Sequence, residues 1–364
     1  MVMNIYRKWL VKTLSIPIIF IVFYAISMYI YDPFQFFHKA WFRDISFQSD
    51  MRAQAIGIIR HYGDFNSVIL GSSLLKNTSA KEANEKLKGE WRNLSMLGSY
   101  FSERKVLLDY LFKHKNIDNI IYSLDGYSLV NPKDNIDMSF KSFYYQDSLL
   151  PYIKFYTNRH FFFCLLRFSN SKDCVGEKPN QAIYTPKIKR WFYGAQFEYI
   201  KNFNTDTVDT SNFNLDKQKK YIKVNLLSFI QKYPKTKFYI IIPPLPRDFY
   251  KFSVFKNYFN YLESPIYFTK LKILTKWILE QTKKYDNVEF YGFDTTNYPD
   301  NYKNYVDNVH YKPDMNSMQL DAIKNNTNKL TLDNIDQYFL LMEKKIQLFD
   351  MEQIKNIVTE QRGL

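Results

Sequence analysis

Short apolar runs alternate with longer amphipathic stretches along most of the chain. The short runs are rich in Val, Ile and aromatic residues, which is typical of buried strands; they are Ser67–Leu70, Trp91–Leu94, Ile117–Leu124, Lys237–Ile242 and Val288–Tyr291. The longer stretches predict helices over Ser49–His61, Ser102–His114, Asp216–Lys232 and Phe268–Tyr285. Strands separated by helices pair in parallel through right-handed crossovers. The pattern therefore predicts an α/β fold, a three-layer sandwich with a central parallel sheet.

The beginning of the chain carries a different pattern, an uncharged run over residues 13–31. About 20 apolar residues are enough to span a bilayer. Bulky aromatic residues stand where a signal-peptide cleavage site needs small ones, so we expect an uncleaved transmembrane helix rather than a cleaved signal peptide. The positive-inside rule then predicts a single-pass protein of the inner (cytoplasmic) membrane with a periplasmic, extracytoplasmic body, because the run follows the basic residues Arg7, Lys8 and Lys12.

These patterns divide the chain into five parts. We expect a cytoplasmic N-terminus over 1–12, a transmembrane anchor over 13–31, a membrane-proximal connector over 32–59, an α/β domain over 60–325 and a C-terminal helical tail over 326–364. Residues at about 131–214 break the alternation of strands and helices and are too aromatic for a flexible linker. We interpret them as an ordered insertion or cap.

Composition narrows the class of protein. The 364 residues are 46% hydrophobic and 18% aromatic, which is enough for one sizeable core and argues against a disordered or fibrous chain. The net charge of +14 is spread along the sequence rather than gathered in one block. Such a spread is typical of solvated faces on a basic protein. If the charge has a partner, an exported body favours anionic glycans or lipid headgroups. No nucleic-acid motif is found, and we expect no nucleic acid as a partner.

The chain has two cysteines, Cys164 and Cys174. An oxidising compartment would permit a disulfide between them, and two unpaired thiols are the alternative. Neither cysteine belongs to a CxxC pair or stands beside a histidine at metal-ligand spacing. We therefore expect no metal site and no cofactor.

Candidate chemistry begins at the sequence VILGSSLLKNTS, residues 68–79, where an apolar run stops at a glycine that allows a sharp turn. The two serines that follow either cap a helix or supply a nucleophile, which needs a base to take its proton. His310 is the best candidate base because Asp307 precedes it by three residues and can hold Nδ1, leaving Nε2 to act. The other histidines have structural explanations: His38, His61, His114 and His160.

The order of these motifs resembles the SGNH/GDSL hydrolase superfamily over about residues 60–325. The family's Gly-Asp-Ser-Leu block stands here as Gly-Ser-Ser-Leu at residues 71–74, and a second block reads NLSMLGS. The resemblance implies a nucleophile at Ser73, an oxyanion-hole glycine at Gly98, and triad partners at Asp307 and His310.

Two departures from the family pattern matter. Ser72 replaces the aspartate of the first block, as in the membrane-anchored branch that includes the alginate acetylation proteins and the teichoic-acid D-alanylation protein. The asparagine of the third block is missing from YSLDGYS, and Leu124 or Asp125 takes its place in the oxyanion hole. A carboxylate there opposes an oxyanion unless it is protonated or turned away. The hole then rests on the N–H groups of Ser73 and Gly98, or activity is weak.

The resemblance implies a membrane-anchored extracytoplasmic esterase or O-acyltransferase that acts on acyl esters of a cell-surface glycan, with acetyl as the expected acyl group. It also implies acyl-transfer activity with a multi-spanning membrane O-acyltransferase as the partner protein. The residues alone support only an esterase. The alternative is a catalytically degenerate subunit that binds glycan or scaffolds a membrane acyltransferase complex. The missing asparagine favours this alternative, and the retained order of Ser, Asp and His favours the enzyme.

Overall fold

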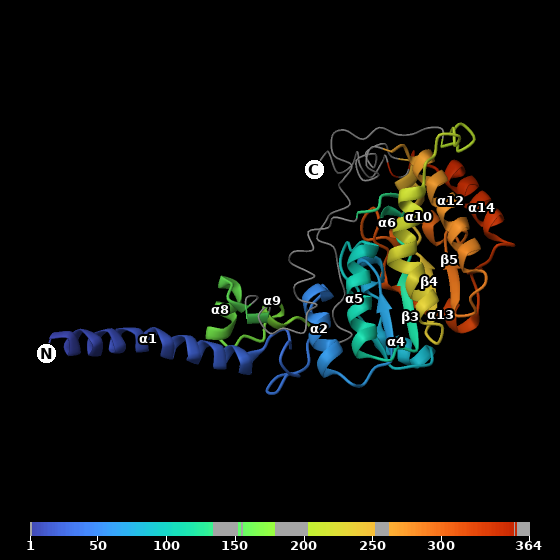
Figure 1. Cartoon of the computed structure of the whole chain (residues 1–364). Helices are drawn as coiled ribbons and strands as arrows, with labels where there is room; N and C mark the ends of the chain where they lie inside the picture. Colours follow the sequence, from blue (N-terminus) through green and yellow to red (C-terminus); the bar gives the residue numbers. More distant parts are fainter. Residues whose placement is uncertain are drawn as a thin grey trace. The chain divides into compact units, whose positions relative to one another are not determined.

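A computed structural model of the chain describes residues 2–133, 152–153, 156–178, 203–251, 262–352 and 354 (Figure 1). The chain divides into two compact units, one over Met1–Gly63 and Ser139–Ala182 and the other over Asp64–Met138 and Ile183–Leu364. The segment expected as a single insertion at 131–214 is thus divided between the two units. Its aromatic stretch at 190–202 lies outside the described residues.

The second unit is built on a six-stranded sheet with helices on both sides (Figure 1). The strand order is β2-β1-β3-β4-β5-β6; the first five pair in parallel and β6 runs antiparallel to β5. The strands are β1 Ser67–Leu70, β2 Trp91–Asn93, β3 Asn119–Ser123, β4 Lys237–Ile242, β5 Val288–Gly292 and β6 Lys329–Leu330. The predicted α/β fold with a central parallel sheet is confirmed. The sequence analysis missed β6, whose 2 residues are too few to show a pattern.

Helices connect these strands. They are α3 Ser73–Lys76, α4 Ala80–Lys86, α5 Phe101–His114, α6 Gly126–Val130, α10 Asp216–Ile222, α11 Ser228–Lys232, α12 Ser264–Thr282, α13 Pro313–Asn325 and α14 Ile335–Leu348, with the 3₁₀ turns η2 Arg247–Tyr250, η4 Tyr298–Asp300 and η5 Tyr302–Asn304. The single helix predicted over Asp216–Lys232 contains a π-helical turn, η1 Lys223–Leu227, between α10 and α11.

Alternate residues of the strands face opposite sides of the sheet, as a strand period of two requires. Ile69 and Ile121 belong to a buried cluster that includes Met315 of α13. On the other side, the ring of Tyr122 in β3 lies 5.8 Å from that of Phe101 at the start of α5. Because both faces are covered, the strands are near-continuous apolar runs.

The C-terminal segment, expected as a helical tail over 326–364, contains α14 and belongs to this second unit. The buried residues of α14 recur at helical spacing: Ile335, Phe339, Met342 and Ile346. The ring of Phe339 lies 5.8 Å from that of Phe268 in α12. The apolar face of this amphipathic helix therefore packs in the core.

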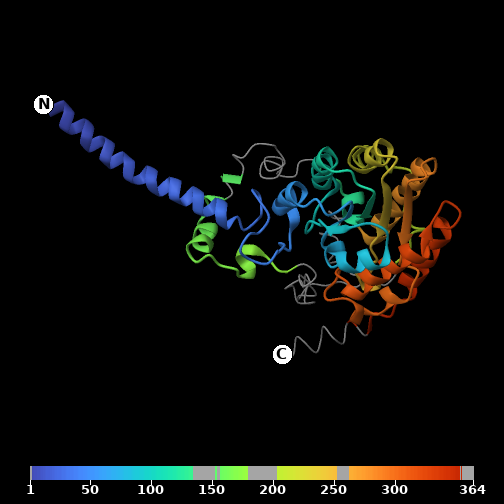
Figure 2. The same cartoon turned by 90° about the horizontal axis from the view of Figure 1, so that it is seen from below.

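The first unit begins with α1 Val2–Tyr31, which Figure 2 shows as one long helix. Its residues Tyr6–Tyr31 are long and apolar enough to cross a membrane. After α1 the chain turns at Asp32, whose buried carboxylate accepts hydrogen bonds from the N–H groups of Phe36, Phe37 and His38. The helix α2 Met51–His61 follows, with eight buried residues. The segment expected as a connector over 32–59 is therefore a folded part of this unit.

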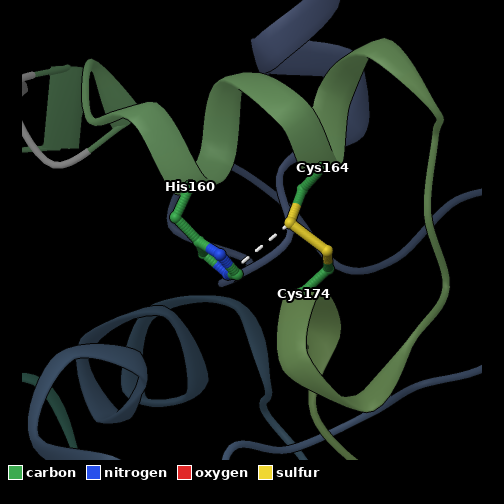
Figure 3. Close-up of side chains that lie close together, drawn as sticks. All are labelled: His160, Cys164 and Cys174. Atoms are coloured by element: carbon green, nitrogen blue, oxygen red, sulfur yellow. Dashed lines mark hydrogen bonds between the residues drawn. A yellow bond between two sulfur atoms is a disulfide. The ribbon is translucent and has the colours of Figure 1, made fainter.

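A disulfide between Cys164 and Cys174 joins α8 Arg159–Leu166 to α9 Lys172–Val175 (Figure 3). Of the two alternatives left open by the sequence, the bonded pair is the one found. The expectation that no histidine stands near the cysteines at metal spacing is wrong, because His160 Nε2 lies 3.6 Å from Cys164 Sγ, one helical turn away. The bonded sulfurs are not thiolates, so this cluster does not form a metal site in this state.

The disulfide predicts the redox state of the protein in the cell. In cells quenched with acid and treated with a maleimide, the wild-type chain should remain unlabelled until it is reduced, when both cysteines react. Cys174→Ser should be labelled once without reduction, which controls for access. Closing a loop of this size should contribute about 3 kcal/mol to the stability of the first unit. Labelling of the wild type before reduction would place its body in a reducing compartment.

Candidate active site

The sequence-predicted site residues come together at the carboxyl edge of the sheet. Open α/β sheets bind ligands at this edge. A cavity of about 780 Å³ is lined there by Ser73, Gly98, Asp125, Asp307 and His310, among others. These residues follow β1, β2, β3 and β5 in the chain. They are therefore far apart in sequence and adjacent in space.

The two serines have different surroundings. Ser72 is the N-cap of α3: its Oγ accepts from the N–H of Leu74 at 3.2 Å and donates to Asp125 Oδ1 at 2.7 Å. Ser73 is partly exposed, and its Oγ lies 2.8 Å from Nε2 of His310. The sequence left a cap and a nucleophile as alternatives for this pair. In the structure Ser72 is the cap, and Ser73 is the serine beside a base.

Two glycines shape the backbone around Ser73 for different reasons. A Cβ at Gly71 would lie 2.6 Å from Ser123 Oγ and 2.8 Å from Cβ of Leu75, so this position has no room for a side chain. Close approach of neighbouring elements, and not the sharp turn expected from the sequence, excludes larger residues there. Gly98 has open space around it but a φ of +59°, a left-handed conformation that favours glycine.

The loop that carries His310 is organised by Asp307. The Oδ1 atom of Asp307 accepts from the N–H groups of Val309 at 2.9 Å and His310 at 2.7 Å, and Oδ2 lies 2.7 Å from His310 Nδ1. Because Asp307 and His310 are three residues apart, the carboxylate of Asp307 can accept from the N–H groups of the loop and from the imidazole ring at the same time. With Nδ1–H donating to Asp307, Nε2 can accept the proton of the Ser73 hydroxyl. The tautomer follows from these partners.

The charge of Asp307 is maintained by the same contacts. Burial raises the pKa of this carboxyl. The hydrogen bond and charge of His310 and the two N–H donors of the loop lower it by more than burial raises it, so the pKa lies below its usual value. Asp307 is therefore a carboxylate at neutral pH. An anion beside Nδ1 stabilises the imidazolium that forms when His310 takes a proton.

A second contact fixes the distance between the serine and the histidine. Asn316 of α13, the helix after His310, donates its Nδ2 to the carbonyl of Leu74 and to Oγ1 of Thr78, both at 2.9 Å. Its side chain is 1% exposed. The helix that follows the histidine is thereby held against the helix that begins with Ser73.

Asp125 does not fill the place of the missing asparagine. Its Oδ1 accepts from Ser72, and its Oδ2 accepts from Ser123 at 2.7 Å and pairs with Arg104. An ionised carboxylate only accepts hydrogen bonds, so this side chain offers no donor to an oxyanion. The alternative, Leu124, donates its N–H to the carbonyl of Ile241 within the sheet. Neither residue therefore offers a free donor in the place of the missing asparagine, and the carboxylate of Asp125 is held by Ser72, Ser123 and Arg104.

The remaining donors are the N–H groups of Ser73 and Gly98. Neither has a hydrogen-bond acceptor within the part of the chain that the structure describes. Both residues line the cavity. These are the two N–H groups on which the sequence analysis expected an oxyanion hole to rest.

Sequence reasoning missed Asn308. This residue lies between Asp307 and His310, lines the cavity and is 4% exposed. Neither its amide nitrogen nor its amide oxygen has a hydrogen-bond partner among the described residues. A buried amide without hydrogen bonds destabilises the folded protein unless a ligand or a water molecule pairs with it. The signal in the sequence was an amide inside the Asp-x-x-His motif, between the two triad candidates.

Sequence reasoning also missed the helices that line the rest of the cavity. Leu271 comes from α12, and Phe339 and Met342 come from α14. Asp294 lines the same space, and burial raises its pKa to about 6 although Arg247 and the hydroxyl of Tyr338 lower it. The C-terminal segment shows an amphipathic pattern with no chemical signal, so its sequence does not mark these residues as part of a site.

Comparison of the chain with protein-family models finds no match, and comparison with curated proteins finds none. Among solved structures, a protein from Streptococcus pneumonia described as a "putative platelet activating factor" is similar over 76% of this chain and 90% of its own, with 12% sequence identity and a TM-score of 0.40. The chemistry of the site therefore rests on its own residues.

The buried pair predicts the effect of restoring an amide at position 125. Asp125→Asn leaves the guanidinium of Arg104 buried without its anion, so it should lower the free energy of unfolding by about 3–5 kcal/mol. The exposed pair of Asp109 with Lys105 provides a matched control, and Asp109→Asn should cost less than about 0.5 kcal/mol. Denaturant unfolding measures both. A stable Asp125→Asn variant with faster ester turnover would contradict this account of Asp125.

Proposed function

We propose that the chain is an SGNH-like serine esterase or O-acyltransferase, anchored in the membrane and acting on acyl esters of a cell-surface glycan. One observation carries the proposal, the hydrogen-bonded series from Ser73 through His310 to Asp307 at the wall of a cavity. The three residue types stand in the order and spacing of the family that the sequence resembles. Each occupies the position its chemistry requires.

The reaction proceeds through an acyl-enzyme. Ser73 Oγ attacks the ester carbonyl while Nε2 of His310 takes its proton, and Asp307 stabilises the resulting imidazolium. The proton then passes to the leaving alcohol as the ester bond breaks. Water or a sugar hydroxyl next attacks the acyl-serine, His310 takes its proton, and Ser73 is regenerated. Water makes the protein an esterase, and a sugar hydroxyl makes it a transferase.

The oxyanion of each tetrahedral intermediate would be bound by the N–H groups of Ser73 and Gly98. Losing a third donor typically costs on the order of 3 kcal/mol of transition-state stabilisation. Asn308 stands between Asp307 and His310 in the sequence, and its amide has no hydrogen-bond partner among the described residues. We propose that it binds a polar atom of the ester. Its buried, unpartnered side chain supports this role.

A glycan as the alcohol part of the ester is supported by two tyrosines of the cavity. The rings of Tyr100 and Tyr127 are partly exposed and meet edge to face at 5.3 Å. Half-exposed aromatic rings suit the apolar faces of sugars. The positive net charge suits an anionic polymer.

Membrane anchoring is supported by the composition around the end of α1. Tyr29 and Trp41 are largely exposed and lie 5.9 Å apart, and the ring of Tyr24 stacks on Phe162 of α8 at 5.9 Å. Aromatic side chains gather at membrane–water interfaces. We propose that α1 crosses the inner membrane with its basic start in the cytoplasm, and that a multi-spanning membrane O-acyltransferase is the partner in a transfer reaction.

The triad predicts a sharp division between neighbouring serines. With full-length protein in lipid nanodiscs and a chromogenic acyl ester, Ser73→Ala and His310→Ala should each lose nearly all turnover, about a thousandfold or more, because triad members act as a unit. Ser72→Ala should keep most of its turnover and lose about 1–2 kcal/mol of stability with its cap. Loss of turnover in Ser72→Ala alone would contradict the assignment of Ser73. If the wild type turns over no ester and still binds glycan, the non-catalytic subunit is the better account.

Asn308 predicts an unusual combination of effects. Asn308→Ala removes no hydrogen bond from the described part of the protein, so stability should be unchanged or slightly raised. It removes the contact proposed for the bound ester, so kcat/KM should fall about tenfold, which corresponds to about 1.4 kcal/mol. A variant that loses stability and keeps its turnover would show that Asn308 is structural.

A further inference from the structure

The cavity beside Ser73 is much larger than the acetyl group expected from the sequence. Its volume of about 780 Å³ is in the range of sites that bind drug-sized ligands. An acetyl group has three non-hydrogen atoms, and at about 30 Å³ for a water-sized atom it fills roughly 100 Å³. Most of the cavity must therefore hold another part of the substrate.

The walls away from the triad are apolar. Tyr267 and Leu271 lie one turn apart on α12, and Phe339 and Met342 lie on one face of α14. The loop after β4 adds Leu245. These two helix faces and the loop line the same space as Ser73.

Few polar groups line this part of the cavity. The hydroxyl of Tyr338 donates to Asp294 Oδ2 at 2.7 Å, and Oδ1 of Asp294 has no hydrogen-bond partner among the described residues. The charge of Asp294 is balanced by Arg247, also buried, whose Nη1 lies 3.9 Å from Asp294 Oδ1. A sugar buried here would lose the hydrogen bonds of its hydroxyls to water, which costs free energy for each group left unpaired. A hydrocarbon chain has no such cost.

We infer that the site binds an acyl chain of at least four carbons, which lies against the faces of α12 and α14, with the alcohol part of the ester on the side of Tyr100 and Tyr127. This inference rests on the proposed function, because it assumes that Ser73 attacks an ester. It replaces acetyl as the expected acyl group. The substrate class is then a medium-chain acyl ester of a sugar, and the same cavity holds the chain in the acyl-enzyme.

The test is a series of p-nitrophenyl esters from acetyl to octanoyl with the full-length protein in lipid nanodiscs. Detergent micelles are avoided because detergent tails would compete for the cavity. Each added methylene should raise kcat/KM by about fourfold, which corresponds to about 0.8 kcal/mol, until the cavity is full. From acetyl to hexanoyl, which adds four methylenes, the rise should reach roughly 250-fold.

Substitutions at Leu245 place the effect in this cavity. Leu245 is partly exposed, so a larger side chain can be accommodated without overpacking the core. Leu245→Trp should remove most of the gain for octanoyl, and an unfolding transition at the wild-type denaturant concentration shows that the variant folds. Leu245→Ala should move the best substrate to a longer chain. Leu340→Trp, an exposed position on the same α14 that does not line the cavity, is the matched control and should leave the series unchanged.

Failure of this inference and failure of the proposed function give different results. If Ser73-dependent turnover is flat or falls from acetyl to octanoyl, the inference is wrong and the esterase assignment stands. If no ester in the series is turned over and Ser73→Ala changes nothing, the proposed function fails and the inference fails with it. A chain-length gain that Leu245→Trp leaves intact would show that the acyl chain binds elsewhere.

Discussion

A buried guanidinium holds together the three strand ends that form the site. Arg104 and Asp125 have fully buried side chains and pair directly. Arg104 also donates to Oγ and the carbonyl of Ser99, after β2, and to the carbonyl of Ser123 at the end of β3. Through Ser72, the carboxylate of Asp125 reaches the end of β1. Burial lowers the pKa of Arg104, but the attraction of Asp125 outweighs this and raises it, so the cation is always present and its partners must stay in place.

This network explains both departures from the family pattern that the sequence resembles. Position 72 has a serine and not the aspartate of the family, and the carboxylate beside it comes from Asp125. The hydroxyl of Ser72 donates to this carboxylate and accepts from the N–H of Leu74 in the helix that begins with Ser73. An asparagine at position 125 could not balance Arg104. The carboxylate at position 125 and the absence of an amide donor there thus have one structural explanation, the ion pair with Arg104. They do not require that catalysis was lost.

The fold and the triad candidates were accessible from the sequence because their signals are local. Buried parallel strands are apolar runs, and Asp307 organises His310 within one turn. The partner of Asp125 could not be predicted from the sequence, because Arg104 lies 21 positions away in a helix with an ordinary amphipathic pattern. The roles of α14 and of residues 32–59 were also missed. Periodicity shows that a face is apolar but does not show what covers it.

The central claim is that Ser73 is a nucleophile activated by His310. It is tested most directly by treating the full-length protein with a fluorophosphonate and locating the adduct by tandem mass spectrometry in the tryptic peptide 61–76, which contains both serines of the motif. The account predicts one adduct, on Ser73, that is absent from His310→Ala. An adduct on Ser72, or equal labelling with and without the histidine, would contradict it.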